Sequence, residues 1–204
     1  MININKAKLA FKEYVSHYNE NDAKIQLKIR HTYKVVDVSE YIGKALGLND
    51  EEVELAKLIA LLHDIGRFEQ IKVTDSFIDF KGFDHADYGV KVLFEDGAIR
   101  KFIEEETYDS IIYTAIKNHN KYEIEQELSG EKLLQSKLIR DSDKTDIFRV
   151  VIEEVNPNMQ LTSKENLKKD IISDETYEQL KSYKLIQSDK VKTELKSDRS
   201  HVVL

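Results

Sequence analysis

The chain has 204 residues, no cysteine, one proline and a net charge of −7. The missing cysteines exclude disulfides, thiolate nucleophiles, iron–sulfur clusters and cysteine zinc sites, so any metal must be held by histidine, carboxylate, carbonyl or water. The negative charge argues against a nucleic-acid polymer as a partner, because phosphates would be repelled. It does not exclude a small phosphorylated substrate, since the local charge at a site can differ from the net charge.

No stretch approaches the roughly 18 consecutive apolar residues that cross a bilayer, and the N-terminal sequence MININKAKLA has no apolar signal-peptide segment. We therefore expect a cytoplasmic protein with no membrane partner. One proline and seven glycines leave few of the turn signals that are typical of β-rich folds. The composition thus favours an all-α chain.

The apolar periodicity predicts helices joined by short polar breaks. These helices cover residues 6–18, 25–46, 50–66, 84–95, 98–105, 107–119 and 130–155, with weaker helical patterning in 163–186. Asn49 or Asp50 is expected to cap the third helix, Gly47 to stop the second, and Gly66 to close the third. Residues 67–83 have no clear period and are expected to form a connecting loop, whose length favours a functional role.

The last long helix is expected to end at Asn156-Pro157, beyond which the sequence is more charged and less periodic. We predict a compact helical domain over residues 1–156. Residues 157–204 are expected to form a charged, mainly helical C-terminal extension that packs on this domain or trails from it.

Several predicted helices place an imidazole or a carboxylate on the face that should point inwards. These residues are His31, His63, Asp64, His119 and Asp143. His31, for example, shares its helix face with Val35 and Val38. Buried carboxylates are costly unless they are paired or bind a metal. A shared site for a divalent cation accounts for the whole set, because neutral imidazoles and ionised carboxylates are its preferred ligands.

The same residues resemble the H…HD…D signature of the HD-domain superfamily. The matching positions are His31, the doublet His63-Asp64 in ALLHDIGR, and Asp143 in LIRDSDKTD. The resemblance covers roughly residues 25–150 and implies a compact all-α bundle, one or two divalent metal ions and phosphohydrolase activity. It also implies that His31, His63, Asp64 and Asp143 hold one ion, with Asp64 as the natural bridge to a second.

Two further histidines bear on the number of ions. His85 in GFDHADYGV and His119 in AIKNHNKY resemble the additional histidines of dinuclear HD proteins. This implies a second ion held by Asp64, His85 and His119. The alternative is that His85 and His119 bind substrate phosphate beside a single ion. The sequence does not distinguish Fe, Mn, Mg, Zn, Co or Ni.

The last carboxylate ligand is ambiguous within RDSDKTD. Asp141 and Asp143 lie about 200° apart around a helix, so they cannot both face one ion, and their apolar neighbours fit either choice. Only the resemblance, which places the ligand before the basic residue of DSDK, selects Asp143. Asp146 lies on roughly the same face and is a candidate to support the ligands from behind.

Basic residues beside these motifs are candidate phosphate contacts. Arg67 follows the doublet and Lys144 follows Asp143, and such side chains bind phosphate oxygens well. The alternative is that both are simply solvated. His17 and His201 match no part of the pattern and are expected on the surface.

Together these observations predict that metal-activated water cleaves a phosphate ester or anhydride. The substrate would be a nucleotide or another small phosphorylated metabolite. The catalytic residues would be His63, Asp64, Arg67, His85, His119 and Lys144. Two alternatives use the same residues: a dinuclear-iron oxygenase of HD type, and a non-catalytic regulatory domain that binds metal or nucleotide.

Overall fold

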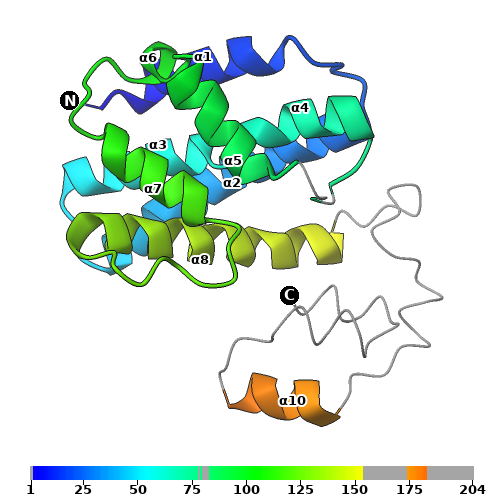
Figure 1. Ribbon diagram of the computed structural model, residues 1–204, viewed down its shortest axis with the longest axis vertical. Coiled ribbons are helices and arrows are strands. Elements are labelled where there is room, and N and C mark those ends of the chain that lie inside the picture. The colour runs from blue at the N-terminus through cyan, green and yellow to red at the C-terminus, as the bar shows by residue number, and fades with distance from the viewer. Residues whose placement is uncertain (1, 78, 80–82, 154–173, 183–204) are drawn as a thin grey trace. The chain divides into compact units, whose positions relative to one another are not determined.

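The computed structural model describes residues 2–77, 79, 83–153 and 174–182, and its regular elements there are all helices (Figure 1). The predicted all-α fold is confirmed. The chain divides into two compact units, Met1–Arg149 and Val150–Leu204. Within the described ranges, no helix is both long and apolar enough to cross a membrane.

Polar caps set the ends of the first helices, α1 (Ile4–Val15), α2 (Ala23–Ala45) and α3 (Asp50–Leu62). Asn3 and Asp22 accept backbone N–H groups of α1 and α2, so both helices begin two residues earlier than predicted. Asn49 and Glu52 form a capping box on α3, which confirms the predicted cap. Gly47, with a φ of 73°, ends α2 as predicted.

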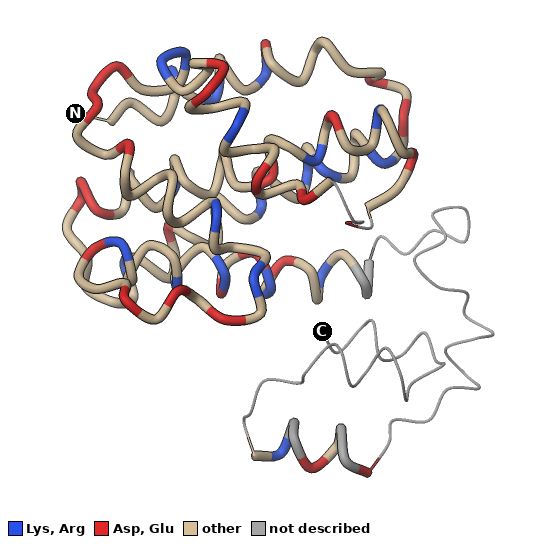
Figure 2. Tube along the Cα trace, viewed as in Figure 1, with Lys and Arg blue, Asp and Glu red and all other residues tan. Residues whose placement is uncertain are grey.

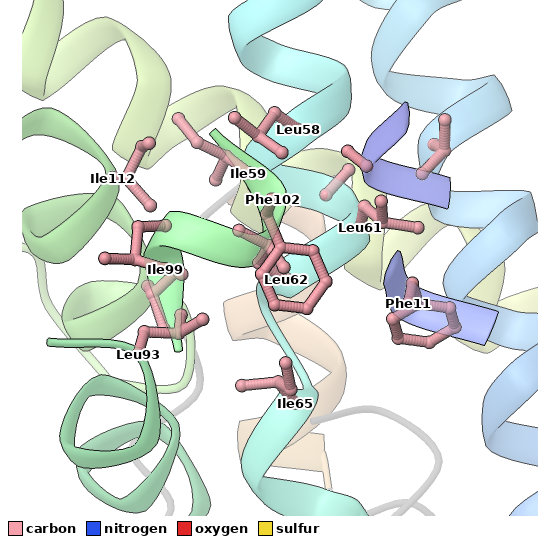
Figure 3. Close-up of a cluster of buried hydrophobic side chains, with 14 of the residues drawn as sticks. Phe11, Leu58, Ile59, Leu61, Leu62, Ile65, Leu93, Ile99, Phe102 and Ile112 are labelled. Carbon is pink, nitrogen blue, oxygen red and sulfur yellow. The ribbon is translucent and has the colours of Figure 1, made fainter. Parts of the chain in front are cut away.

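Helix α3 forms the centre of the first unit. It packs against α1, α2 and α7 (Asp109–Asn118), and Leu58, Leu61 and Leu62 are fully buried. Figure 3 shows these leucines among apolar side chains of other helices, including Phe11 of α1 and Ile112 of α7. Burial of each such side chain contributes about 1.5–3 kcal/mol. The C-terminal end of α3, which carries the histidine–aspartate doublet, is therefore firmly held.

Two predictions are wrong directly after this doublet. Helix α4 (Ile65–Thr74) begins at Ile65, so Gly66 lies in its first turn instead of ending the preceding helix, and the predicted loop 67–83 starts as helix. Ile65, Phe68 and Ile71 are buried at a spacing of three residues. Because polar residues lie between these positions, the helical period of α4 was not recognised in the sequence.

Close backbone contact explains the glycine at position 66. A Cβ there would lie 2.2 Å from the carbonyl oxygen of His85 and 2.7 Å from the backbone nitrogen of Gly89. Both atoms belong to α5 (His85–Val90). Gly66 therefore lets α5 approach α4 closely, and this approach brings His85 towards Asp64.

The later helices agree with the prediction in position but are mostly shorter. Helix α5 continues into a π-helical turn, η1 (Lys91–Glu95), and is followed by α6 (Ile99–Phe102), α7 and α8 (Gly130–Glu153). In the second unit, α10 (Asp174–Lys181) lies inside the predicted range 163–186. The rest of that range and the predicted boundary at residues 156 and 157 lie outside the described residues, so the division at that boundary stays a prediction.

We expect the substitution Gly66→Ala to destabilise the protein by about 2 kcal/mol or more, because the new methyl group would overlap backbone atoms that cannot move independently. Gly43→Ala is the matched control, since its Cβ would meet only side chains, the nearest being Val53 Cγ2 at 3.3 Å. Thermal or urea unfolding measures both. A Gly66→Ala protein as stable as Gly43→Ala would contradict the close contact between α4 and α5.

Candidate metal centre

The structure brings all six predicted metal-ligand residues together. These residues are His31 on α2, His63 and Asp64 between α3 and α4, His85 at the start of α5, His119 at the end of α7, and Asp143 on α8. None of the six is more than 5% exposed. Each comes from a separate helix or helix end, except the doublet, whose two members share one connection.

Two of the imidazoles are held by the helices that they terminate. His63 and His119 are the C-cap residues of α3 and α7. The Nδ1 atom of each lies close to the carbonyl oxygen three residues earlier, 2.7 Å from Ala60 and 2.6 Å from Ile116. A carbonyl can only accept, so both Nδ1 atoms donate, and each ring satisfies a carbonyl that its helix leaves free.

The other two imidazoles are held by carboxylates. The Nδ1 atom of His31 donates to Asp146 Oδ2 at 2.7 Å, and that of His85 donates to Asp79 Oδ2 at 2.7 Å. All four rings therefore use Nδ1 for a fixed hydrogen bond and present Nε2 to the centre. A partner behind the ring is typical of metal-binding histidines, because it fixes both ring orientation and tautomer.

The first donor group joins His31, His63, Asp64 and Asp143. The Nε2 atom of His31 lies 3.1 Å from Asp143 Oδ1 and 3.8 Å from Asp64 Oδ2. The Nε2 atom of His63 lies 3.5 Å from Asp64 Oδ2 and 3.7 Å from Asp143 Oδ1. Two imidazoles and two carboxylates therefore surround one point.

The second donor group uses the other oxygen of Asp64. Its Oδ1 atom lies 3.4 Å from His85 Nε2 and 3.7 Å from His119 Nε2, and the two Nε2 atoms are 3.0 Å apart. The donor atoms of Asp64, His85 and His119 lie close enough to hold a metal ion, as do those of His31, His63 and Asp64. Asp64 thus faces both groups, one oxygen to each.

The contact between His85 and His119 suits a bound cation. Burial lowers the pKa of His85 to about 4 and also lowers that of His119, so both rings are neutral at neutral pH. Their Nδ1 atoms already hold the single proton of a neutral ring. Two unprotonated Nε2 atoms therefore face each other at 3.0 Å, an arrangement that is repulsive until a cation lies between them.

The charges of the first group also suit a divalent cation, although positively charged side chains already face its carboxylates. Burial alone would raise the pKa values of Asp64 and Asp143, but the nearby Lys28, His31 and His63 hold both well below the ordinary range. Both carboxylates are therefore ionised although buried. The Nε2 atom of His63 is buried and has no hydrogen-bond partner among the described residues. The donor set fits a divalent cation, which would compensate the buried charge.

The geometry favours Asp143 over Asp141 as the last ligand. Asp143 is buried and faces the imidazoles, whereas Asp141 is exposed. Asp146 is also buried and supports His31 from behind, and Arg149 in turn holds it through two hydrogen bonds. The choice of Asp143, which the helical pattern left open and only the family resemblance selected, agrees with this arrangement; ligation itself stays a prediction.

The two predicted phosphate contacts differ in their surroundings. Lys144 is 45% exposed, and its Nζ atom lies 3.0 Å from Asp143 Oδ2, so it lies at the edge of the first group. Arg67 is less exposed, and its Nη1 atom donates to Gln70, Asp79 and the carbonyl of Phe77. These hydrogen bonds hold the guanidinium within the protein, and they were not foreseen.

Two residues at the centre were missed in the sequence. Lys28, only 15% exposed, contacts Asp64 Oδ2; it continues the inward stripe of His31 and Val35 by one helical turn, and this spacing was a usable signal. Asp79 supports His85, but it lies where the sequence has no helical period. The length of the predicted loop 67–83 favoured a functional role for that segment, but it did not single out Asp79.

The remaining candidates do not join the centre. His17 is exposed, as predicted, and His201 lies outside the described residues. A third group, formed by Asp79, Asp84 and His85, also brings donor atoms together. However, Asp84 caps α5 and pairs with Lys121 at 3.2 Å, so its charge is compensated without a cation.

In a solution at about pH 7.5, we expect the binding of a cation to release one proton from His63. Burial alone would lower the pKa of His63, but the carboxylates of Asp64 and Asp143 raise it to about 9, so the metal-free ring is protonated and a cation must displace that proton. The apparent affinity should rise by up to about tenfold per pH unit up to about pH 9 and then level off. Calorimetry in buffers of different ionisation enthalpy measures the released proton; a pH-independent affinity would contradict ligation by His63.

Comparison with known proteins identifies the family. No curated protein and no solved structure matches the chain. The model of one family, the HD domain, matches residues 29–147, more than half of the 204 residues. The matched stretch contains all six residues that converge at the centre. The chain therefore belongs to the HD domain family.

Proposed function

We propose that this protein is a metal-dependent phosphohydrolase that cleaves a phosphate ester or anhydride of a nucleotide or another small phosphorylated metabolite. The observation that carries the proposal is the pair of donor groups that share Asp64. Membership of the HD domain family supports the same type of reaction. The type of bond that is cleaved, the substrate class and the dependence on a metal ion all belong to this proposal.

Each donor group would hold one cation: His31, His63, Asp64 and Asp143 the first, and Asp64, His85 and His119 the second. Divalent cations there supply Lewis acidity, which lowers the pKa of water and offsets charge on phosphoryl oxygens. His85 and His119 were also predicted to act on the substrate. Their neutral rings and facing Nε2 atoms suit ligation better than proton donation.

Basic side chains around the centre would bind the phosphate. Figure 2 shows lysines and arginines interspersed with acidic residues along the helices of Met1–Arg149, so the net charge of −7 does not make every part of this unit acidic. The ammonium groups of Lys28 and Lys144 lie against the carboxylates of Asp64 and Asp143. Bound cations would compensate these carboxylates, and both ammonium groups could then bind phosphoryl oxygens.

Arg67 has a different place in the proposal. Its Nη1 atom is fully used by Gln70, Phe77 and Asp79, whereas its Nε atom is buried without a hydrogen-bond partner among the described residues and lies 3.6 Å from Asp64 Oδ1. We therefore propose that Arg67 acts mainly by holding its neighbours at the centre. In this proposal, the ammonium groups of Lys28 and Lys144 bind the substrate phosphate directly.

The substitutions His63→Ala and Asp64→Ala should each abolish hydrolysis. Loss of a metal ligand removes several kcal/mol of transition-state stabilisation, which corresponds to a loss in turnover of on the order of 10³-fold. His17→Ala, at an exposed position, is the matched control and should retain full activity. The assay uses metal-supplemented protein and a panel of phosphate esters and nucleotides. If His63→Ala and Asp64→Ala both retain the turnover of the wild-type protein, the proposed hydrolysis is wrong.

The substitution Lys28→Met should separate catalysis from metal binding. We expect kcat/KM to fall by about 100-fold or more, as when a preorganised donor to the transition state is removed. Metal affinity should stay unchanged or increase, because a positive charge beside Asp64 is lost. Lys24→Met, on the same helix but paired with Asp75, is the control. A Lys28→Met enzyme with unchanged kcat/KM would remove Lys28 from the phosphate site.

The oxygenase alternative uses the same ligands, and no observed contact favours it over hydrolysis. Iron-loaded protein that consumes oxygen, and does not hydrolyse any phosphate ester of the panel, would support it against the proposal.

A further inference from the structure

We propose that Asp79 is a positioning residue for the second donor group, and that it sets the affinity of that group for its cation without binding the cation itself. The inference rests on the proposed function, because it assumes that Asp64, His85 and His119 hold a second cation. Its basis is a set of hydrogen bonds from a carboxylate to His85. Within the described part of the chain, His31 has the same kind of support, whereas His63 and His119 are held by backbone carbonyls.

The carboxylate of Asp79 accepts a hydrogen bond from Nδ1 of His85, the ring nitrogen that faces away from the metal centre. Its two oxygens lie 2.9 and 2.7 Å from His85 Nδ1, and Oδ1 lies 3.3 Å from the backbone nitrogen of the same residue. The opposite ring atom, Nε2, faces Asp64 and His119. Asp79 therefore fixes the tautomer and the direction in which His85 presents its free nitrogen.

Helix α4 holds Asp79 in turn. Arg67 Nη1 donates to Asp79 Oδ1 at 3.0 Å, and Gln70 Nε2 donates to the same oxygen at 2.8 Å. Arg67 and Gln70 follow Asp64 at intervals of three residues, so all three lie on one face of the chain at the start of α4. The carboxylate of Asp79 therefore accepts hydrogen bonds from His85, Arg67 and Gln70 together.

Asp146 is the counterpart at the first donor group. It lies 2.7 Å from His31 Nδ1 and is held by Arg149, just as Asp79 lies against His85 and is held by Arg67. Asp146 belongs to the long helix α8, whereas Asp79 lies in the connection between α4 and α5. Each donor group therefore combines one histidine supported by a carboxylate with one histidine supported by a carbonyl.

This arrangement predicts that the two groups can be weakened separately. Asp79→Asn retains the shape of the side chain but replaces a charged acceptor by a weaker one. It should reduce cation affinity at the second group by about 10- to 100-fold, the usual effect of removing a supporting partner of a metal ligand. The first group should not respond, because none of its ligands contacts Asp79 in the described residues.

The test uses full-length protein with one donor group left in each background. His31→Ala retains Asp64, His85 and His119, and His119→Ala retains the first group. Manganese binding to both proteins is measured by calorimetry, with and without Asp79→Asn. We expect Asp79→Asn to weaken manganese binding in the His31→Ala background and to change it less than twofold in the His119→Ala background.

Asp146→Asn is the mirror control, with the opposite pattern expected in the two backgrounds. Metal-free unfolding of each variant shows whether the fold persists. Equal weakening by Asp79→Asn in both backgrounds indicates a general structural role and overturns the inference, as does no weakening in either.

Complete loss of manganese binding in the His31→Ala background, with the fold intact, overturns the inference too, because no separate second site would exist. The proposed hydrolysis would survive that result, since the first group alone can support a single-cation enzyme. Failure of the inference and failure of the proposed function are therefore distinguishable.

Discussion

The structure of the centre depends on the buried charge of Asp64. This carboxylate is 3% exposed, and an ionised group at such a position is costly unless other charges compensate it. Lys28 contacts one oxygen, and imidazole nitrogens surround both. The carboxylate nevertheless faces two separate groups of donor atoms, which is the geometry of a ligand shared by two cations. The surrounding helices supply the side chains that compensate this charge.

The fold meets the requirement by using helix ends. His63 and His119 each end a helix and donate Nδ1 to a carbonyl of that same helix, so the ring orientation is fixed by the helix itself. Gly66 then lets α5 approach α4 and brings His85 opposite His119. The apolar core that buries α3 supplies the rigidity. His63 and His119 need no partner from another element, whereas His31 and His85 are also held by the carboxylates of Asp146 and Asp79.

Sequence reasoning was successful where chemistry and helical period coincide. His31 lies on an apolar stripe and the doublet follows an apolar run, so an inward direction could be predicted for each. Gly66 was misinterpreted because a glycine after a helix suits both a C-cap and a close contact, and only the distant residues His85 and Gly89 decide between them. Asp79 could not be predicted, since its role arises from a contact with α5 and from no local pattern.

The most direct test of the account is a crystal soaked in manganese and measured near the manganese absorption edge. Two anomalous peaks are expected, one on each side of Asp64. One should lie within coordination distance of His31 and His63, and the other within that distance of His85 and His119. A map without a peak beside Asp64, or with manganese bound only at Asp79 and Asp84, would contradict it.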